Sequence, residues 1–128
     1  MKKKFRIYTI GFLILTILFG VYYFYVRPQQ MVKVTLEWGR LAPFPDEIDD
    51  FKIQTEGSMF TRSFRATFKC NPKTIHEWVK SSPGLQDAQV EMKGAIKHYE
   101  IKPGGGANSA TVDIDTKTDA VKVYVCWS

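Results

Sequence analysis

The sequence predicts an α+β protein: an N-terminal single transmembrane helix followed by a small antiparallel sheet packed by one short helix. Three observations carry this prediction. Residues 7–26 contain no charged side chain. Several later segments alternate apolar and polar residues, as strands with one buried face do. Residues 72–81 instead place apolar residues at helical spacing. Strands before and after a single helix are typical of α+β domains with an antiparallel sheet.

The uncharged segment 7–26 is long enough to cross a membrane. At about 1.5 Å per residue, such a helix spans ~30 Å, the thickness of the hydrocarbon core. Tyr8 lies near one end, and Tyr22, Tyr23 and Tyr25 lie near the other, as interfacial aromatics do. A cleaved signal peptide has a shorter apolar core and a small-x-small cleavage site, and this segment has neither. We therefore expect a signal-anchor helix.

Basic residues on the N-terminal flank predict the orientation of this helix. They are Lys2, Lys3, Lys4 and Arg6. The positive-inside rule then predicts that residues 1–6 form a basic cytoplasmic tail of a single-pass protein of the cell membrane. Residues 27–30 are expected to be a short linker, because Pro28 stops a helix. Residues 31–128 are expected to form one extracytoplasmic α+β domain.

The net charge of +5 is unevenly distributed along the chain. Five of the 18 basic residues lie before Pro28, which leaves 13 basic residues against 13 acidic ones after it. The predicted domain is therefore neutral. A nucleic-acid-binding domain has a basic surface that neutralises phosphates, so we expect no nucleic-acid partner.

The first half of the domain contains three predicted strands. Residues 32–38 alternate apolar and polar side chains and predict a strand, followed by an acidic, proline-containing loop over residues 39–50. Residues 51–53 predict a short strand. The most regular alternation covers residues 58–70. Its apolar members, expected on one buried face, are Phe60, Phe64, Ala66 and Phe68.

A change of period marks the helix. Asn71 is a good N-cap and Pro72 suits the first helical position, so a helix is predicted over residues 72–81. Trp78 is its expected anchor on the sheet. Three further strands, separated by the loop around residues 104–106 and the turn at 116–119, are predicted at residues 95–101, 110–114 and 121–127.

An acidic loop is the densest cluster of metal-ligand side chains. It contains Asp46, Glu47, Asp49 and Asp50. Such carboxylates suit a divalent cation or a solvated loop, and both interpretations stay open. Gly104 to Gly106 are not followed by the helix start and Lys-Ser/Thr of a phosphate loop. His76 and His98 lack zinc-ligand spacing. No catalytic residue, metal ligand or cofactor is assigned.

Two cysteines and one phenylalanine remain as candidate site residues. An extracytoplasmic compartment favours a disulfide between Cys70 and Cys126. Strand alternation favours free thiols, because Cys70 is in phase with the buried phenylalanines and Cys126 is out of phase with Val125. Phe44, between two prolines, is either a partner contact or a side chain folded back over the core.

These features together predict a non-catalytic protein. The layout resembles that of small single-pass envelope proteins of bacteria. We expect a membrane-anchored binding or structural module, held to the membrane by residues 7–26, with an envelope protein as its partner. The alternative is a small envelope enzyme, or a metal- or ligand-binding sensor that uses the acidic loop 46–50.

Overall fold

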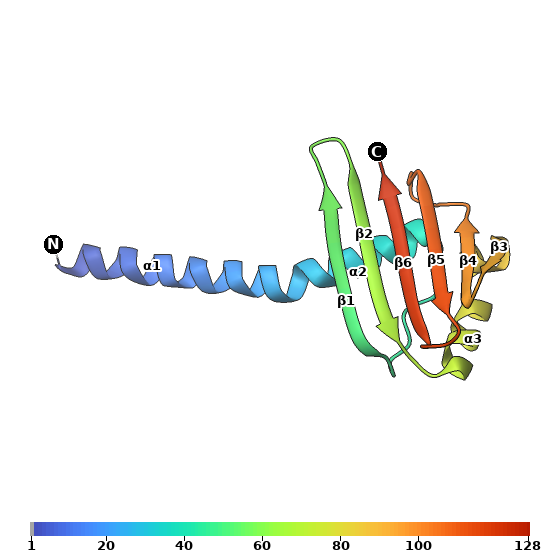
Figure 1. The fold of residues 1–128 in the computed structure, drawn as a ribbon. Coiled ribbons are helices and arrows are strands. Elements are labelled where there is room, and N and C mark those ends of the chain that lie inside the picture. Colours follow the sequence, from blue (N-terminus) through green and yellow to red (C-terminus); the bar gives the residue numbers. More distant parts are fainter. Residues whose placement is uncertain (1) are drawn as a thin grey trace. The chain divides into compact units, whose positions relative to one another are not determined.

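The computed structural model describes residues 2–128 (Figure 1). Met1, the first residue of the predicted tail 1–6, lies outside the described residues. Contacts between residues divide the chain into two units, Met1–Gln30 and Met31–Ser128. Each unit is described by itself below.

The first unit is helical. Helix α1 covers Lys2–Val21, and the π-helical segment η1 covers Tyr22–Val26. The helical stretch that starts at Lys2 is long and apolar enough to cross a membrane. Its two threonines bond within the helix: the hydroxyls of Thr9 and Thr16 each donate to a carbonyl four residues earlier, at 2.9 Å. These polar side chains are therefore satisfied without water, as a lipid environment requires.

Residues 27–30 are helical, so Pro28 does not stop the helix as the sequence analysis expected. Helix α2 covers Arg27–Gly39 and follows η1 without a break. The reason lies in the wider turn before Pro28. The N–H of Arg27 donates to the carbonyl of Tyr22, five residues earlier. Because this turn departs from the i−4 pattern, the missing N–H of Pro28 interrupts the helix less than it would in a regular α-helix.

The strand predicted at residues 32–38 is also wrong, since these residues belong to α2. The buried side of the helix contains Met31, Val34, Thr35 and Trp38, which are three or four residues apart. Val34 and Trp38 satisfy a period of two and a helical period equally well. An existing helix on the N-terminal side removes the nucleation cost, which favours helix over strand.

The sheet has six antiparallel strands in the order β1-β2-β6-β5-β4-β3. In chain order they are β1 (Asp49–Gly57), β2 (Arg62–Lys69), β3 (Gln89–Lys93), β4 (Ile96–Ile101), β5 (Ser109–Asp115) and β6 (Ala120–Trp127). The last three were predicted. The short strand predicted at 51–53 is longer, and β3 was not predicted, because this edge strand is exposed along its whole length.

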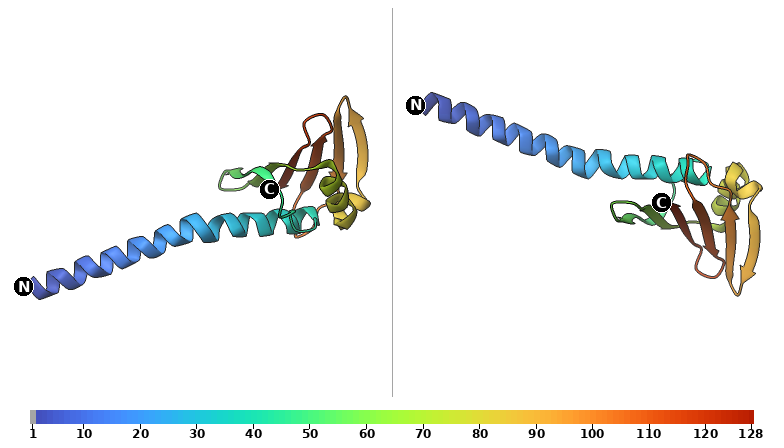
Figure 2. Two further views of the ribbon diagram at one scale, coloured as in Figure 1. Left: turned by 90° about the horizontal axis from the view of Figure 1, so that it is seen from below. Right: turned by 90° about the horizontal axis from the view of Figure 1, so that it is seen from above.

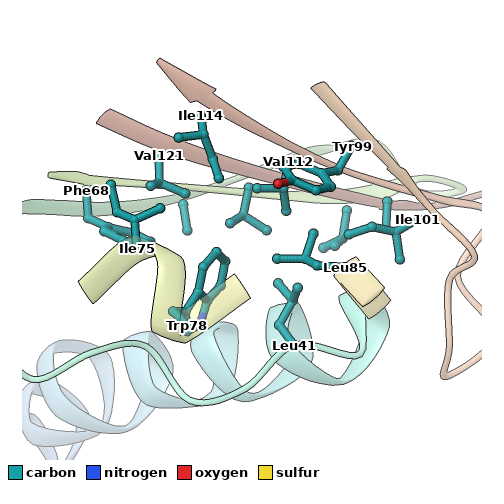
Figure 3. Packing of buried hydrophobic residues seen from close by; sticks show 14 of the residues in the cluster. Leu41, Phe68, Ile75, Trp78, Leu85, Tyr99, Ile101, Val112, Ile114 and Val121 are labelled. Atoms are coloured by element: carbon teal, nitrogen blue, oxygen red, sulfur yellow. The ribbon is translucent and has the colours of Figure 1, made fainter. Parts of the chain in front are cut away.

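Two helices follow β2, and the first of them confirms the predicted helix at 72–81. They are α3 (Pro72–Ser81) and α4 (Pro83–Gln86). The side chain of Asn71 caps α3 by accepting from the N–H of Lys73 at 2.9 Å. Trp78 is only 4% exposed, and its ring centroid lies 5.8 Å from that of Phe68. Helix α3 therefore packs on the sheet through Trp78, as Figure 3 shows.

The core lies between the sheet and α2, α3 and α4 (Figure 3). The strands contribute alternate residues to it: Phe64, Ala66 and Phe68 from β2, Tyr99 and Ile101 from β4, Ala110, Val112 and Ile114 from β5, and Val121, Val123 and Val125 from β6. Phe60 was expected among them and is 77% exposed instead. It precedes β2 and lies in the turn after β1, where strand alternation does not apply.

Candidate binding surface

The sheet has one face covered by helices and one uncovered face. Within Met31–Ser128, the helices lie on one side of the strands, as Figure 2 shows. Side chains that alternate with the core residues point to the other side. We call this surface the uncovered face. Its central members are Ser63, Arg65 and Thr67 from β2, Lys122, Tyr124 and Cys126 from β6, Thr111 and Asp113 from β5, and His98 from β4.

Arg65 and Tyr124 occupy the middle of the uncovered face. They are register partners on the central strands β2 and β6. The guanidinium carbon of Arg65 lies 5.8 Å from the centroid of the Tyr124 ring, within cation–π range. The nearest carboxylate oxygen, from Glu56, is 3.8 Å from the guanidinium. The Nε of Arg65 is buried and has no hydrogen-bond partner among the described residues. The Arg65 side chain as a whole is 38% exposed, so its terminal N–H groups keep donor capacity for another molecule.

The hydroxyl of Tyr124 is neutral at physiological pH. The neighbouring Cys126 side chain, and then partial burial, raise the pKa of Tyr124 above its ordinary value near 10. A neutral phenol both donates and accepts hydrogen bonds. The centre of the uncovered face therefore offers a planar cation beside an aromatic ring with a polar tip.

A second polar pair extends the uncovered face toward β4. His98 and Asp113 are register partners, and the Nδ1 atom of His98 lies in a short contact with the Oδ1 atom of Asp113. Their side chains are 18% and 33% exposed. Lys122 is the partner of Asp113 on its other side. Asp113 and Lys122 thus bring both signs of charge to this part of the face, which suits a protein surface better than a polyanion.

The acidic loop borders an open cleft at the end of the sheet where β2 meets α3. The cleft has a volume of about 510 Å³, and its lining includes Glu47, Asp49, Cys70 and Asp119. Burial, followed by the charges of Asp119 and Asp49, raises the pKa of the Cys70 thiol. Among residues 2–128, no three His, Cys, Asp or Glu side chains are arranged to hold a metal ion. The four carboxylates of loop 46–50 thus do not converge.

Cys70 and Cys126 are both free thiols. The strand register explains why no bridge joins them. Cys126 is the partner of Ser63 near the start of β2, whereas Cys70 follows the last residue of β2 and bonds to Asp119. About seven residues of extended strand, roughly 20 Å, separate them. A disulfide requires Cα atoms within about 7 Å, so the disulfide left open by the sequence is not formed.

Phe44 folds back over the core. Its ring centroid lies 5.3 Å from that of Phe68, 5.7 Å from that of Phe51 and 6.0 Å from that of Trp78. Of the two interpretations, this contact set matches the structural one. The side chain is therefore not a free anchor for a partner.

The glycines at residues 104–106 serve packing against α2. The N–H of Gly104 donates to the carbonyl of Trp38 at 2.8 Å, so it is not free for an anion. Gly105 has a φ of +62°, and a Cβ atom there would lie 2.6 Å from Cδ1 of Trp38. The loop after β4 therefore needs glycine to approach the end of α2 closely.

No family model, curated protein or solved structure matches the chain. The fold and surface define a class only: an α+β domain that follows a helix long enough to span a membrane. The sequence did not single out Arg65 and Tyr124 as site residues. Both stand on the polar side of alternating strands, but only the pairing of β2 with β6 brings them together.

Proposed function

We propose that this chain is a membrane-anchored binding module without a catalytic role, and that its uncovered face binds a protein partner at the membrane. The pair Arg65–Tyr124 carries this proposal. The Nε of Arg65 is buried, so the N–H groups at the exposed end of the guanidinium are the donors that another molecule can reach. A carboxylate or carbonyl of a partner would accept from these N–H groups in a charge-assisted hydrogen bond.

The composition of the uncovered face supports a protein as the partner. Tyrosine and arginine dominate interface hot spots, and here they lie adjacent at the centre of a sheet. Their surroundings carry both signs of charge, including Asp113 and Lys122. A polar face stays soluble when it is unoccupied. If the partner shares the membrane, effective concentration makes even a weak contact sufficient.

The location of the domain is part of the proposal. We place residues 1–6 in the cytoplasm, residues 7–26 across the cell membrane and residues 31–128 outside, because of the basic N-terminal flank. Alkaline phosphatase fused after Ser128 is expected to be active, and a green fluorescent protein fused there is expected to stay dark. The opposite pair of results would reverse the orientation.

Site-specific crosslinking in native membranes tests the binding surface. A photoreactive phenylalanine analogue replaces Tyr124 in one chain and the exposed Glu77 of α3, on the covered side, in a matched control. We expect adducts from position 124 and none from position 77. Adding Arg65→Ala is expected to lower the adduct yield about tenfold, which corresponds to a hot-spot loss of ~1.4 kcal/mol. Equal yields from both positions would refute the proposed surface.

A second candidate is a ligand-binding sensor that uses the cleft beside the acidic loop 46–50. The observation that favours it is that Glu47, Asp49 and Asp119 line one open cleft. Their negative potential suits a small organic cation. A thermal-shift titration of the full chain with spermidine tests it, with Asp119→Asn as the comparison. No shift in melting temperature, or an equal shift in Asp119→Asn, would exclude this candidate.

A further inference from the structure

The turn between β1 and β2 carries the two most exposed apolar side chains of the unit Met31–Ser128. Met59 is 90% exposed and Phe60 is 77% exposed. They lie side by side in sequence at the end of a hairpin, where neither the helices nor the neighbouring strands cover them. We call residues 58–61 the hairpin tip. Adjacent apolar side chains that are exposed to water form a patch, and such patches mark sites of contact with proteins or membranes.

The polar groups of the hairpin tip bond to one another. The N–H of Ser58 donates to the Thr61 hydroxyl at 3.2 Å, and the N–H of Phe60 donates to the Ser58 hydroxyl at 3.4 Å. The two hydroxyls are 3.1 Å apart. A Cβ atom on Gly57 would lie 2.2 Å from the carbonyl oxygen of Thr61, so the closed turn depends on glycine. Because these groups are already paired, moving the tip out of water costs less.

The charges beside the hairpin tip fit phosphate headgroups. Arg62 directly follows the tip, and the acidic residue that precedes the turn, Glu56, lies 3.8 Å from the guanidinium of Arg65. Trp127 is the register partner of Arg62 and is 44% exposed. Apolar side chains followed by a tryptophan and an arginine are the composition of membrane-interface segments, with the cation at the phosphates and the indole at the headgroup level. A protein partner would not require this sequence of groups.

The connection between the anchor and the unit that carries the hairpin is short. Only residues 27–30 lie between the uncharged segment 7–26 and Met31, where this unit begins. So short a connection keeps the unit close to the bilayer surface.

We propose that the hairpin tip inserts into the headgroup region of the bilayer that holds residues 7–26. This inference rests on the proposed membrane anchor. Met59 and Phe60 reach the acyl boundary, while Arg62 and Trp127 remain among the headgroups. The insertion gives the domain a second attachment besides its helix. It therefore restricts which way the uncovered face points and orients it toward a partner in the same membrane.

Lipid-borne quenchers test the insertion on the full chain in vesicles of phosphatidylcholine and phosphatidylglycerol. An environment-sensitive fluorophore is attached at Met59→Cys in a Cys126→Ser background, and Cys70, which is 7% exposed, is checked for the absence of labelling. The matched control carries the label at Lys117→Cys, in the turn at the other end of β6. We expect a nitroxide at a shallow acyl position to quench the label at 59 at least about twofold more strongly than the label at 117. Adding Phe60→Ser is expected to bring the two levels together.

A third label separates the two proposals. Leu15→Cys lies in the middle of the segment 7–26 and reports membrane insertion with a nitroxide near the end of the acyl chain. If the label at 15 is quenched and the labels at 59 and 117 are quenched equally, the anchor stands and the hairpin inference falls. If the label at 15 is not quenched, the anchor itself falls. If the label at 59 instead becomes more shielded from water as the protein-to-lipid ratio rises, the tip contacts a second copy of the chain. That result would overturn the proposed insertion into the bilayer.

Discussion

The two faces of the sheet use the same strands for different purposes. Along β6, Val121, Val123 and Val125 are at most 1% exposed, and they alternate with polar residues that no helix of their unit covers. Burial of each valine stabilises the fold by ~1.5–3 kcal/mol. The residues between them contribute little of that kind. One strand therefore holds the domain together on one side and leaves the other side free for recognition.

This difference orders the expected effects of substitution. A domain of this size is stable by only about 5–15 kcal/mol, so one large change on the covered face removes much of it. On the uncovered face, the same kind of truncation removes contacts with solvent-exposed neighbours and changes stability little. A measurement that fails to separate the two faces would contradict the proposed role of the uncovered one.

The largest expected effect is on the covered face at Trp78. Its indole contacts Phe68 and Phe44, and its Nε1 donates to the carbonyl of Ala42 at 3.0 Å. Trp78→Ala is expected to lower the free energy of unfolding by ~3–5 kcal/mol, because it leaves a cavity and an unpaired carbonyl. Thermal melting of the fragment 31–128 measures this. An unchanged melting temperature would show that α3 packs through another side chain.

A smaller effect is expected at Gly84, where α4 meets the end of α2. A Cβ atom there would lie 2.1 Å from the carbonyl oxygen of Gly39, and the N–H of Gly84 donates to the carbonyl of Arg40 at 2.7 Å. The clash is with backbone, which cannot rotate away. Gly84→Ala is expected to cost about 1–3 kcal/mol of stability. The control is Ser81→Ala, because Ser81 is exposed. Gly94→Ala is not suitable, because the φ of +64° at Gly94 strains any residue that has a side chain.

Local chemistry made α3 predictable, whereas α2 was decided by the helix that precedes it. Asn71 and Pro72 specify a helix start through their own side chains, and the structure has that start. Residues 32–38 fit two periods, and only the helix that precedes them decides between the periods. Sequence periodicity reports which faces are buried. It reports the secondary structure only when a single period fits.

The binding surface depends on register, which a single sequence does not reveal. Arg65 and Tyr124 lie far apart in the chain, and their contact follows from the pairing of β2 with β6. The cysteines illustrate the same limit. Their phase along the strands favoured free thiols, but their separation became known only when Cys126 was placed opposite Ser63. Alternation thus predicts the face of a residue and not its neighbours.

A pH-dependent effect is expected at the ion pair between Arg40 and Asp87, which joins the end of α2 to α4. The Nη2 of Arg40 donates to Oδ1 of Asp87 at 2.7 Å and holds the pKa of that carboxyl below its ordinary value near 3.8. A lowered pKa in the folded state means that the ionised form stabilises the fold above pH 4. That contribution is lost as the pH falls through the lowered pKa.

Acid unfolding of Asp87→Asn measures this contribution. At neutral pH the variant is expected to be slightly less stable than the parent, because the pair is exposed to solvent. As the pH falls through the lowered pKa of Asp87, the two melting temperatures are expected to converge. The pKa of Asp115 is also lowered, chiefly by the N–H of Lys117, and this carboxyl remains in both proteins. A difference that widens as the pH falls would contradict the assigned pair.

The smallest expected effect on stability is at Arg65, and its neighbour Phe64 makes the comparison direct. The two side chains follow one another on β2 and point to opposite faces. Phe64 is 7% exposed and contacts Trp38, so Phe64→Ala is expected to cost ~3–5 kcal/mol. Arg65 has a cation–π contact and a loose ion pair, so Arg65→Ala is expected to cost at most about 1 kcal/mol. Denaturant unfolding of both variants measures the difference. If Arg65→Ala is as destabilising as Phe64→Ala, the uncovered face has a structural role. A lower crosslinking yield in the Arg65→Ala variant would then result from unfolding and not from the loss of a contact with the partner.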